Sequence, residues 1–119
     1  MTRKTRSDRK FNVKVWVKPI DKDIFRTHCY SFHLSMMFVG EKYVTTVLDT
    51  LNEHELESVI ESRLDTYLKM NSRHDNYEVL GLRFTNNYWQ RLAYFAVLYK
   101  TSVAKVASCL FQYSLDNYE

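Results

Sequence analysis

The stretch LRFTNNYWQRLAYFAVLYKTSVAKVASCLF, residues 82–111, carries the strongest structural signal in this chain. It begins inside a segment, residues 78–85, in which apolar and polar side chains alternate as they do in a half-buried β-strand. Apolar residues then recur at helical spacing from Leu92 onwards, and a second helical stripe follows a Thr101-Ser102 break. Ser and Thr are favoured N-cap residues. The stretch therefore predicts one short strand followed by two helices, the second capped by Thr101 or Ser102.

The same order of elements is predicted near the amino terminus. Residues 11–18, FNVKVWVK, alternate in the same way. When the chain is shifted along itself so that Leu82 falls on Val15, no gap is needed and the polarity pattern of the whole unit is kept. This shift, called the repeat offset below, also brings the cap position Ser102 onto Ser35. We interpret the sequence as two copies of one strand–helix–helix unit, and expect the two strands to pair because neither can satisfy its backbone alone.

The first copy admits a second interpretation between residues 28 and 44. Tyr30, Phe32 and Leu34 alternate with polar residues there, as they would in a strand. Gly40 inside a helix also costs roughly 1 kcal/mol relative to Ala. The helical interpretation is favoured, because the ungapped match to the second copy accounts for more residues.

An acidic amphipathic helix is predicted between the copies, over residues 52–70. Thr50 with Glu53 resembles a capping box at its start. Its outer face carries most of the acidic residues of segment 49–65, which holds six Asp or Glu against one Arg. A solvated helix face is the simpler interpretation of these carboxylates, and an acidic protein-docking surface is the alternative. Residues 71–76 are the expected connector to the second strand.

Composition places the chain among globular proteins. It has 119 residues with only two Gly and one Pro, which favours helices over a β-sandwich with many turns. Residues 1–18 hold seven Lys or Arg against one Asp, so this end suits a polyanion. No apolar run is long enough to span a bilayer, and no membrane partner is expected. Cys29 and Cys109 are interpreted as buried, reduced thiols of a cytoplasmic protein.

No constellation of catalytic residues stands out. The sequence lacks a Gly-rich phosphate loop, a nucleophile elbow and zinc-type Cys/His spacing. His28, Cys29 and His33 gather locally, but on a helix His28 and His33 lie five residues apart and off a shared face. We therefore expect no enzyme, no metal and no cofactor.

A strand followed by two helices, the second of them capped by Ser or Thr, closely resembles the repeating unit of the ribbon-helix-helix (MetJ/Arc) family of DNA-binding proteins. The resemblance covers residues 78–117 well and 11–51 more weakly. Two copies in one chain look like the tandem arrangement of TraY-type relaxosome accessory proteins. The resemblance implies a mainly α fold with a short two-stranded antiparallel β-ribbon, a tandem ribbon-helix-helix pseudo-dimer. The implied segments are a basic flexible arm (1–10), a first copy (11–51), the acidic helix and linker (52–76) and a second copy (77–119).

In that family the ribbon lies in the DNA major groove. The resemblance implies base readout by the outward side chains of the two strands, which here are Lys14, Trp16, Lys18, Arg83 and Thr85. Phosphate contacts are implied for the basic arm and for the start of each second helix. These residues are Arg3, Lys4, Arg6, Arg9, Lys10, Ser35, Thr101, Ser102, Val103 and Lys105. Gly81 takes an outward position without a side chain.

The implied function is sequence-specific binding of double-stranded DNA, by an accessory factor at an origin of transfer or by a transcriptional repressor of a mobile element. A relaxase or another protein that contacts the acidic helix is a further expected partner. The chain would act as a monomeric pseudo-dimer or as a homo-oligomer on DNA. The alternative is a protein-interaction module or inhibitor that docks through residues 52–70 and Trp16 and does not read DNA.

Overall fold

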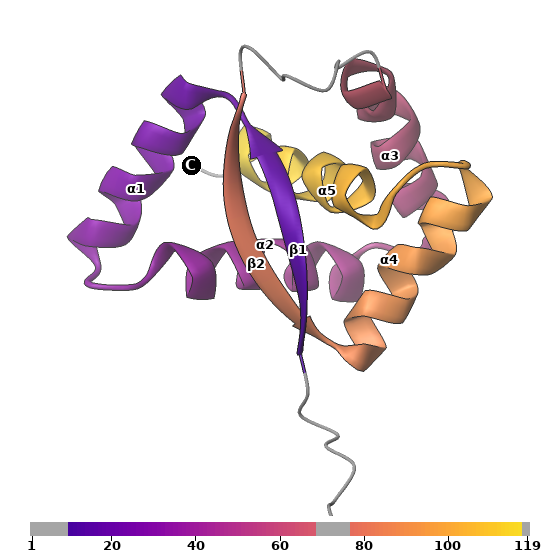
Figure 1. Ribbon diagram of the computed structural model, residues 1–119, viewed down its shortest axis with the longest axis horizontal. Coiled ribbons are helices and arrows are strands. Elements are labelled where there is room, and N and C mark those ends of the chain that lie inside the picture. Colours follow the sequence, from indigo (N-terminus) through magenta and orange to yellow (C-terminus); the bar gives the residue numbers. More distant parts are fainter. Residues whose placement is uncertain (1–9, 69–76, 118–119) are drawn as a thin grey trace, which may run out of the picture.

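The computed structural model describes residues 10–68 and 77–117. The elements in chain order are β1 (Lys10–Val17), α1 (Pro19–Ser31), α2 (Met36–Thr50), α3 (Glu53–Leu68), β2 (Glu78–Thr85), α4 (Asn86–Leu98) and α5 (Val103–Asn117). β1 and β2 form a two-stranded antiparallel ribbon. In Figure 1 the ribbon lies in front of α2 and α5, with α1 on the left and α3 and α4 on the right. The expected mainly helical class with an antiparallel two-stranded ribbon is confirmed.

The ribbon is buried on one face only. Val13 pairs with Leu82 and Val15 pairs with Leu80. The side chains of these inward positions are 7% exposed or less, whereas the alternate positions along both strands are exposed or half-buried. The predicted alternation is therefore confirmed for both strands. β1 begins and ends one residue earlier than the predicted strand 11–18, and residues 1–9 of the expected arm lie outside the described residues.

Both halves of the chain contribute to one hydrophobic core. The buried cluster draws side chains from all seven elements. At its centre the ring of Phe25 from α1 meets that of Phe111 from α5 edge-on, with 5.2 Å between centroids. Cys29 and Cys109 are free thiols and are fully buried, as predicted. The two units are therefore not separate domains.

The two halves match under the repeat offset that carries Val15 onto Leu82. α1 and α4 each span 13 residues, from Pro19 and from Asn86, and α2 and α5 each span 15 residues, from Met36 and from Val103. The connection between helices also repeats. His33 (φ 58°) and Lys100 (φ 55°) both adopt the left-handed conformation, and the same offset carries one onto the other.

Residues 36–50 form a helix, so the strand interpretation of residues 28–44 is wrong. Gly40 within α2 has a packing reason. A Cβ at this position would lie 2.7 Å from Cδ2 of Leu82, a fully buried side chain of β2. The missing side chain lets α2 approach the underside of the ribbon, which offsets the helix-propensity cost of glycine.

α3 begins with a capping box, but not the predicted one. The backbone N–H of Glu55 donates to Oδ1 of Asn52 at 2.8 Å, and the N–H of Asn52 donates to Oε1 of Glu55 at 2.9 Å. Thr50 still belongs to α2, where its hydroxyl donates to the carbonyl oxygen of Thr46. The expected Thr50–Glu53 box is therefore wrong by two residues.

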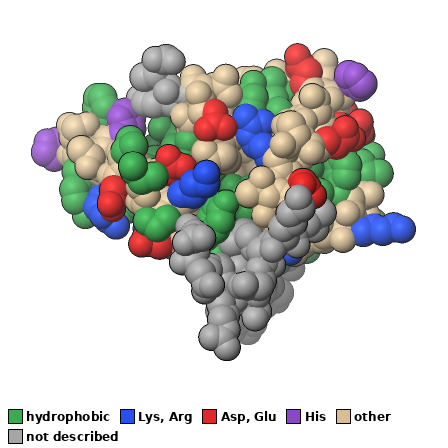
Figure 2. Space-filling view, turned by 90° about the horizontal axis from the view of Figure 1, so that it is seen from above, with side chains coloured by type: hydrophobic (Ala, Val, Ile, Leu, Met, Phe, Trp, Pro, Cys, Tyr) green, Lys and Arg blue, Asp and Glu red, His purple; other side chains and the backbone are tan. Residues whose placement is uncertain are grey.

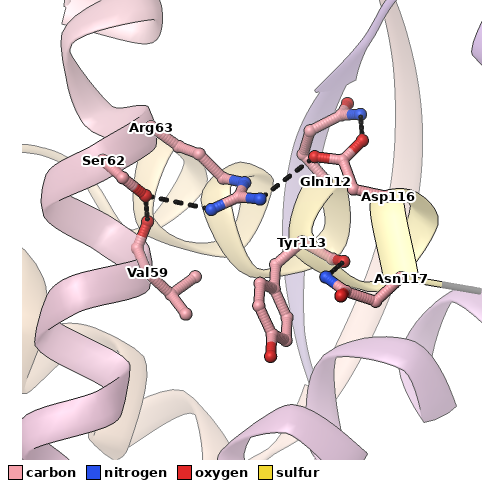
Figure 3. A network of polar contacts seen from close by, with 7 residues as sticks. All are labelled: Val59, Ser62, Arg63, Gln112, Tyr113, Asp116 and Asn117. Carbon is pink, nitrogen blue, oxygen red and sulfur yellow. Dashed lines mark hydrogen bonds and ion pairs between the residues drawn. The ribbon is translucent and has the colours of Figure 1, made fainter.

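α3 packs against α5. Figure 3 shows the polar side of this contact, where Arg63 of α3 donates to Oδ2 of Asp116 at 3.1 Å. The same guanidinium lies over the ring of Tyr113, 5.2 Å from its centroid. None of the helices described for residues 10–68 and 77–117 is both long and apolar enough to cross a membrane.

Candidate nucleic-acid interface

The outer face of the ribbon carries most of the residues predicted to read bases. Cross-strand partners point to the same side of a sheet, so the pairs Lys14–Gly81 and Asn12–Arg83 place Lys14 and Arg83 on one face. Lys14 and Arg83 are exposed there, and Lys18 is exposed just beyond the end of β1, as the residue before α1. A Cβ on Gly81 would have no neighbour within 4 Å, so the space above the middle of the ribbon is open.

Two of the predicted readout residues are less exposed. Thr85 is half-buried at the end of β2, immediately before α4. Trp16 is half-buried, and part of its ring packs against the core. Only part of the Trp16 side chain is therefore exposed on the outer face of the ribbon.

Three outward residues were not predicted as base-readout positions. Asn12 lies opposite Arg83, and Val79, 38% exposed, lies opposite Trp16. Lys10 lies opposite Thr85 at the end of the ribbon, 3.7 Å from Oε1 of Glu41. The alternation of β1 places Asn12 on the outer face, and this signal was sufficient to find it.

Each strand is held along its outer edge by the second helix of the other copy. The backbone N–H of Trp16 in β1 donates to Oγ of Ser108 in α5 at 2.8 Å. The N–H of Arg83 in β2 donates to Oε2 of Glu41 in α2 at 3.1 Å. The repeat offset carries Trp16 onto Arg83, and it also carries Glu41 onto Ser108. The two copies therefore exchange equivalent contacts across the ribbon.

The second helices begin with equivalent serine caps. Oγ of Ser35 accepts from the N–H of Phe38 at 3.0 Å, and Oγ of Ser102 accepts from the N–H of Lys105 at 3.2 Å. Both serines are exposed, so further N–H groups of each first turn can meet an anion.

The flanking residues predicted for phosphate contact are more enclosed. Val103 and Lys105 are half-buried. Oγ1 of Thr101 is buried and has no hydrogen-bond partner. No other buried side-chain oxygen or nitrogen of the described residues lacks one. Ser102 and not Thr101 is the cap, because Oγ of Ser102 accepts from the N–H of Lys105 whereas Oγ1 of Thr101 makes no hydrogen bond.

A cleft of about 250 Å³ lies beside one end of the ribbon. Its walls carry three cationic side chains, from Lys10, Lys42 and Arg83, around the single carboxylate of Glu41. Lys42 lies 5.6 Å from the centroid of the Phe38 ring. The cleft extends the cationic outer face from the ribbon onto α2. Lys42 was not predicted, since only the tertiary packing of α2 brings it to the ribbon.

The acidic residues near α3 bind tyrosines of the same chain. The hydroxyl of Tyr94 donates to Oε2 of Glu53, and that of Tyr99 donates to Oε2 of Glu61, both at 2.8 Å. Burial, and then the hydrogen bond to Glu61, raise the pKa of Tyr99 above its usual value. These carboxylates join α3 to α4, so the acidic face is only partly available to a partner.

The outer surfaces of the two copies differ. α1 exposes Ile20 (68%) and Ile24 (62%), whereas the equivalent positions of α4 carry Asn87 and Arg91. Figure 2 shows hydrophobic side chains among charged ones at the α1 end, on the left. The match between the two halves under the repeat offset therefore does not extend to these surface residues.

Within the described residues, no group of three His, Cys, Asp or Glu side chains could hold a metal ion. The ring of His28 instead meets that of Phe32, with 5.0 Å between centroids.

No protein-family model, curated protein or solved structure matches this chain. The ribbon, its exchanged contacts and its exposed cations are therefore the observations from which function is inferred.

Proposed function

We propose that this protein binds double-stranded DNA in a sequence-specific manner, as a single-chain, tandem ribbon-helix-helix pseudo-dimer. The observation that carries the proposal is a two-stranded ribbon with one buried apolar face and an opposite face that exposes Lys10, Lys14 and Arg83. A two-stranded ribbon fits the major groove of B-DNA, where each base pair presents a distinct pattern of donors and acceptors.

The repeated geometry supports the pseudo-dimer. In a two-fold dimer each subunit makes the same contact to the other. Here the hydrogen bonds Trp16 to Ser108 and Arg83 to Glu41 form such a reciprocal pair within one chain. The strand pairing has the same property, because the repeat offset carries Val13 onto Leu80 and carries its partner Leu82 back onto Val15.

In the proposed complex the side chains divide into two tasks. Arg83 and Lys14 meet base edges and supply sequence choice, since Arg and Lys suit O6 and N7 of guanine. The amino ends of α2 and α5, capped by Ser35 and Ser102, receive phosphates on either side of the ribbon. Phosphate contacts supply most of the affinity and make it dependent on salt.

Such a protein acts by occupying its site. We propose that it serves as a relaxosome accessory factor at an origin of transfer or as a repressor of a mobile element, in either case on DNA in the cytoplasm. The alternative, a protein-interaction module that docks through residues 52–70, has less support, because Glu53 and Glu61 already accept hydrogen bonds from α4 and from the residue that follows it.

The replacement Arg83→Ala tests the proposal. It removes a base contact that is worth about 1–3 kcal/mol, so affinity for the preferred duplex should fall by roughly five- to 150-fold. Affinity for random duplex should fall much less. The ratio of the affinity for the preferred duplex to the affinity for random duplex should therefore decrease. Fluorescence anisotropy at one fixed salt concentration measures both, on a duplex selected from a random pool.

Arg26→Ala is the matched control. It removes the same charge from α1, where Arg26 forms an ion pair with Asp23 at 2.8 Å. Discrimination between preferred and random duplex should stay at the wild-type level in this variant. If Arg83→Ala also keeps wild-type discrimination, the ribbon does not read the bases.

A further inference from the structure

The outer face of the ribbon has two chemically different ends. At one end the cross-strand pairs are Lys10–Thr85 and Asn12–Arg83, which offer cationic and amide hydrogen-bond groups. At the other end the outward pair is Trp16–Val79, which offers apolar surface. The pair Lys14–Gly81 lies between them.

These two ends occupy equivalent places in the repeat. The repeat offset carries Asn12 onto Val79 and Trp16 onto Arg83. The inward positions keep their character under the same offset, since Val13 and Val15 fall on Leu80 and Leu82. The core face of the ribbon is thus pseudo-symmetric, whereas its outer face is not.

Beside the apolar end, the charge of Glu78 is balanced by Lys22. Its ammonium group lies 3.6 Å from Oε1 of Glu78 and donates to the carbonyl oxygen of Val79 at 3.1 Å. Beside this ion pair, the outward side chains of the two strands are those of Trp16 and Val79, and Lys18 lies just beyond the end of β1.

A dimer of identical subunits reads a palindrome, because its two-fold axis coincides with that of the DNA. We propose that this ribbon instead reads a non-palindromic duplex in one orientation. The half of the DNA site under Asn12 and Arg83 presents purines. An adenine faces the amide of Asn12, and a guanine faces the guanidinium of Arg83. The half under Trp16 and Val79 presents thymine methyl groups, the apolar feature of the major groove. This inference rests on the proposed DNA-binding function and specifies its ligand.

Selection of binders from a pool of random duplexes tests the inference. The wild-type protein should enrich a non-palindromic motif, with guanine and adenine on one side and thymine on the other. Exchanging the two halves of that motif should lower affinity at least about tenfold. An enriched palindrome would overturn this inference and leave the proposed DNA binding intact. Failure to enrich any motif would overturn the proposed function as well.

Two double replacements give the two ends of the outer face the same residue pair, and they should change the motif in opposite ways. The double replacement Asn12→Val with Arg83→Trp gives both ends a Trp–Val pair, so thymine should be enriched in both outer parts of the motif, while the base pairs beneath Lys14 and Gly81 stay asymmetric. Both positions are exposed, so the core is left unchanged. The converse replacement, Trp16→Arg with Val79→Asn, gives both ends an Arg–Asn pair and should enrich guanine and adenine in both outer parts of the motif.

Circular dichroism and the urea midpoint establish whether each variant is folded. The exposed pair is the decisive one, because Trp16 packs partly against the core and its replacement can weaken the fold. A folded Asn12→Val, Arg83→Trp protein that still enriches the wild-type motif would contradict the inference.

Discussion

At the scale of single residues, Ser108 and Glu41 do the same work in different surroundings. Each accepts a hydrogen bond from the outer edge of the strand that belongs to the other copy. Ser108 is fully buried, and its hydroxyl also donates to the carbonyl oxygen of Ala104 at 2.8 Å. The side chain of Glu41 is 17% exposed and also lies near Lys10. The free-energy cost of losing the acceptor should therefore differ between the two sites.

Ser108→Ala should lower the free energy of unfolding by about 1–3 kcal/mol, because the N–H of Trp16 is left without its acceptor in a partly buried place. Glu41→Ala should cost less than about 1 kcal/mol, since the N–H of Arg83 is exposed and water can replace the carboxylate. Urea denaturation of both variants measures the two values. An equal loss in both would mean that burial does not distinguish these contacts.

Some single-residue roles could not be predicted from the sequence. Thr50–Glu53 and Asn52–Glu55 both have the spacing of a capping box, and only the place where α2 ends selects the second. Thr101 and Ser102 are equally good N-cap types, and the fold buries the hydroxyl of one of them.

At the scale of elements, tyrosines join α4 and its C-terminal end to the acidic segment. The hydroxyl of Tyr88 donates to Oδ2 of Asp49 at 2.6 Å, and Tyr94 and Tyr99 bind Glu53 and Glu61. These contacts span 38 to 41 residues of sequence. Periodicity within one helix carries no information about such distant partners. The sequence therefore predicts the acidic stripe but not the tyrosines that bind it.

Stability should fall at alkaline pH. Burial is the main cause that raises the pKa of Tyr67 and Tyr99, whose usual value is 10.0, and it also raises that of Cys109 to about 12. The folded state holds these groups neutral while the unfolded chain ionises. Their contribution is therefore fully present below the unfolded pKa values, about 9 for the thiol and 10 for the phenols, and is lost as pH rises through the folded values.

Urea midpoints between pH 8 and 11 should therefore decrease with pH in the wild-type protein. Tyr99→Phe should show a shallower decrease, because one titrating phenol is gone, and should lose about 0.5–1.5 kcal/mol at pH 8 with its hydrogen bond to Glu61. A slope identical to that of the wild type would show that Tyr99 is not held neutral by its contact with α3.

The order and type of the elements could be predicted because polarity patterns record burial locally. Alternation in residues 11–18 and 78–85 indicates both strands, and the repeat offset correctly favours a helix for residues 36–50. The gathering of Lys42 with Lys10 and Arg83 depends on how α2 lies against β2, which the sequence pattern does not specify.

At the scale of the whole molecule, the main feature is a two-stranded ribbon that lies over one shared core. Two strand–helix–helix segments, residues 10–50 and 78–117, share a core, pair their strands and leave an exposed face with Lys10, Lys14 and Arg83. The inner face of the ribbon follows the repeat, and the outer face departs from it at every outward position along the paired strands. We infer that the repeat serves folding, and that its departures serve the choice of DNA site.

Methylation interference on the selected duplex tests this claim most directly. Dimethyl sulfate modifies N7 of guanine, which faces the major groove, and N3 of adenine, which faces the minor groove. Modified N7 positions in one half of the site should weaken binding, because a methylated N7 can no longer accept a hydrogen bond from Arg83, while modified N3 positions beneath the ribbon should have no effect. Interference confined to adenine N3, or to neither atom, would contradict a ribbon in the major groove.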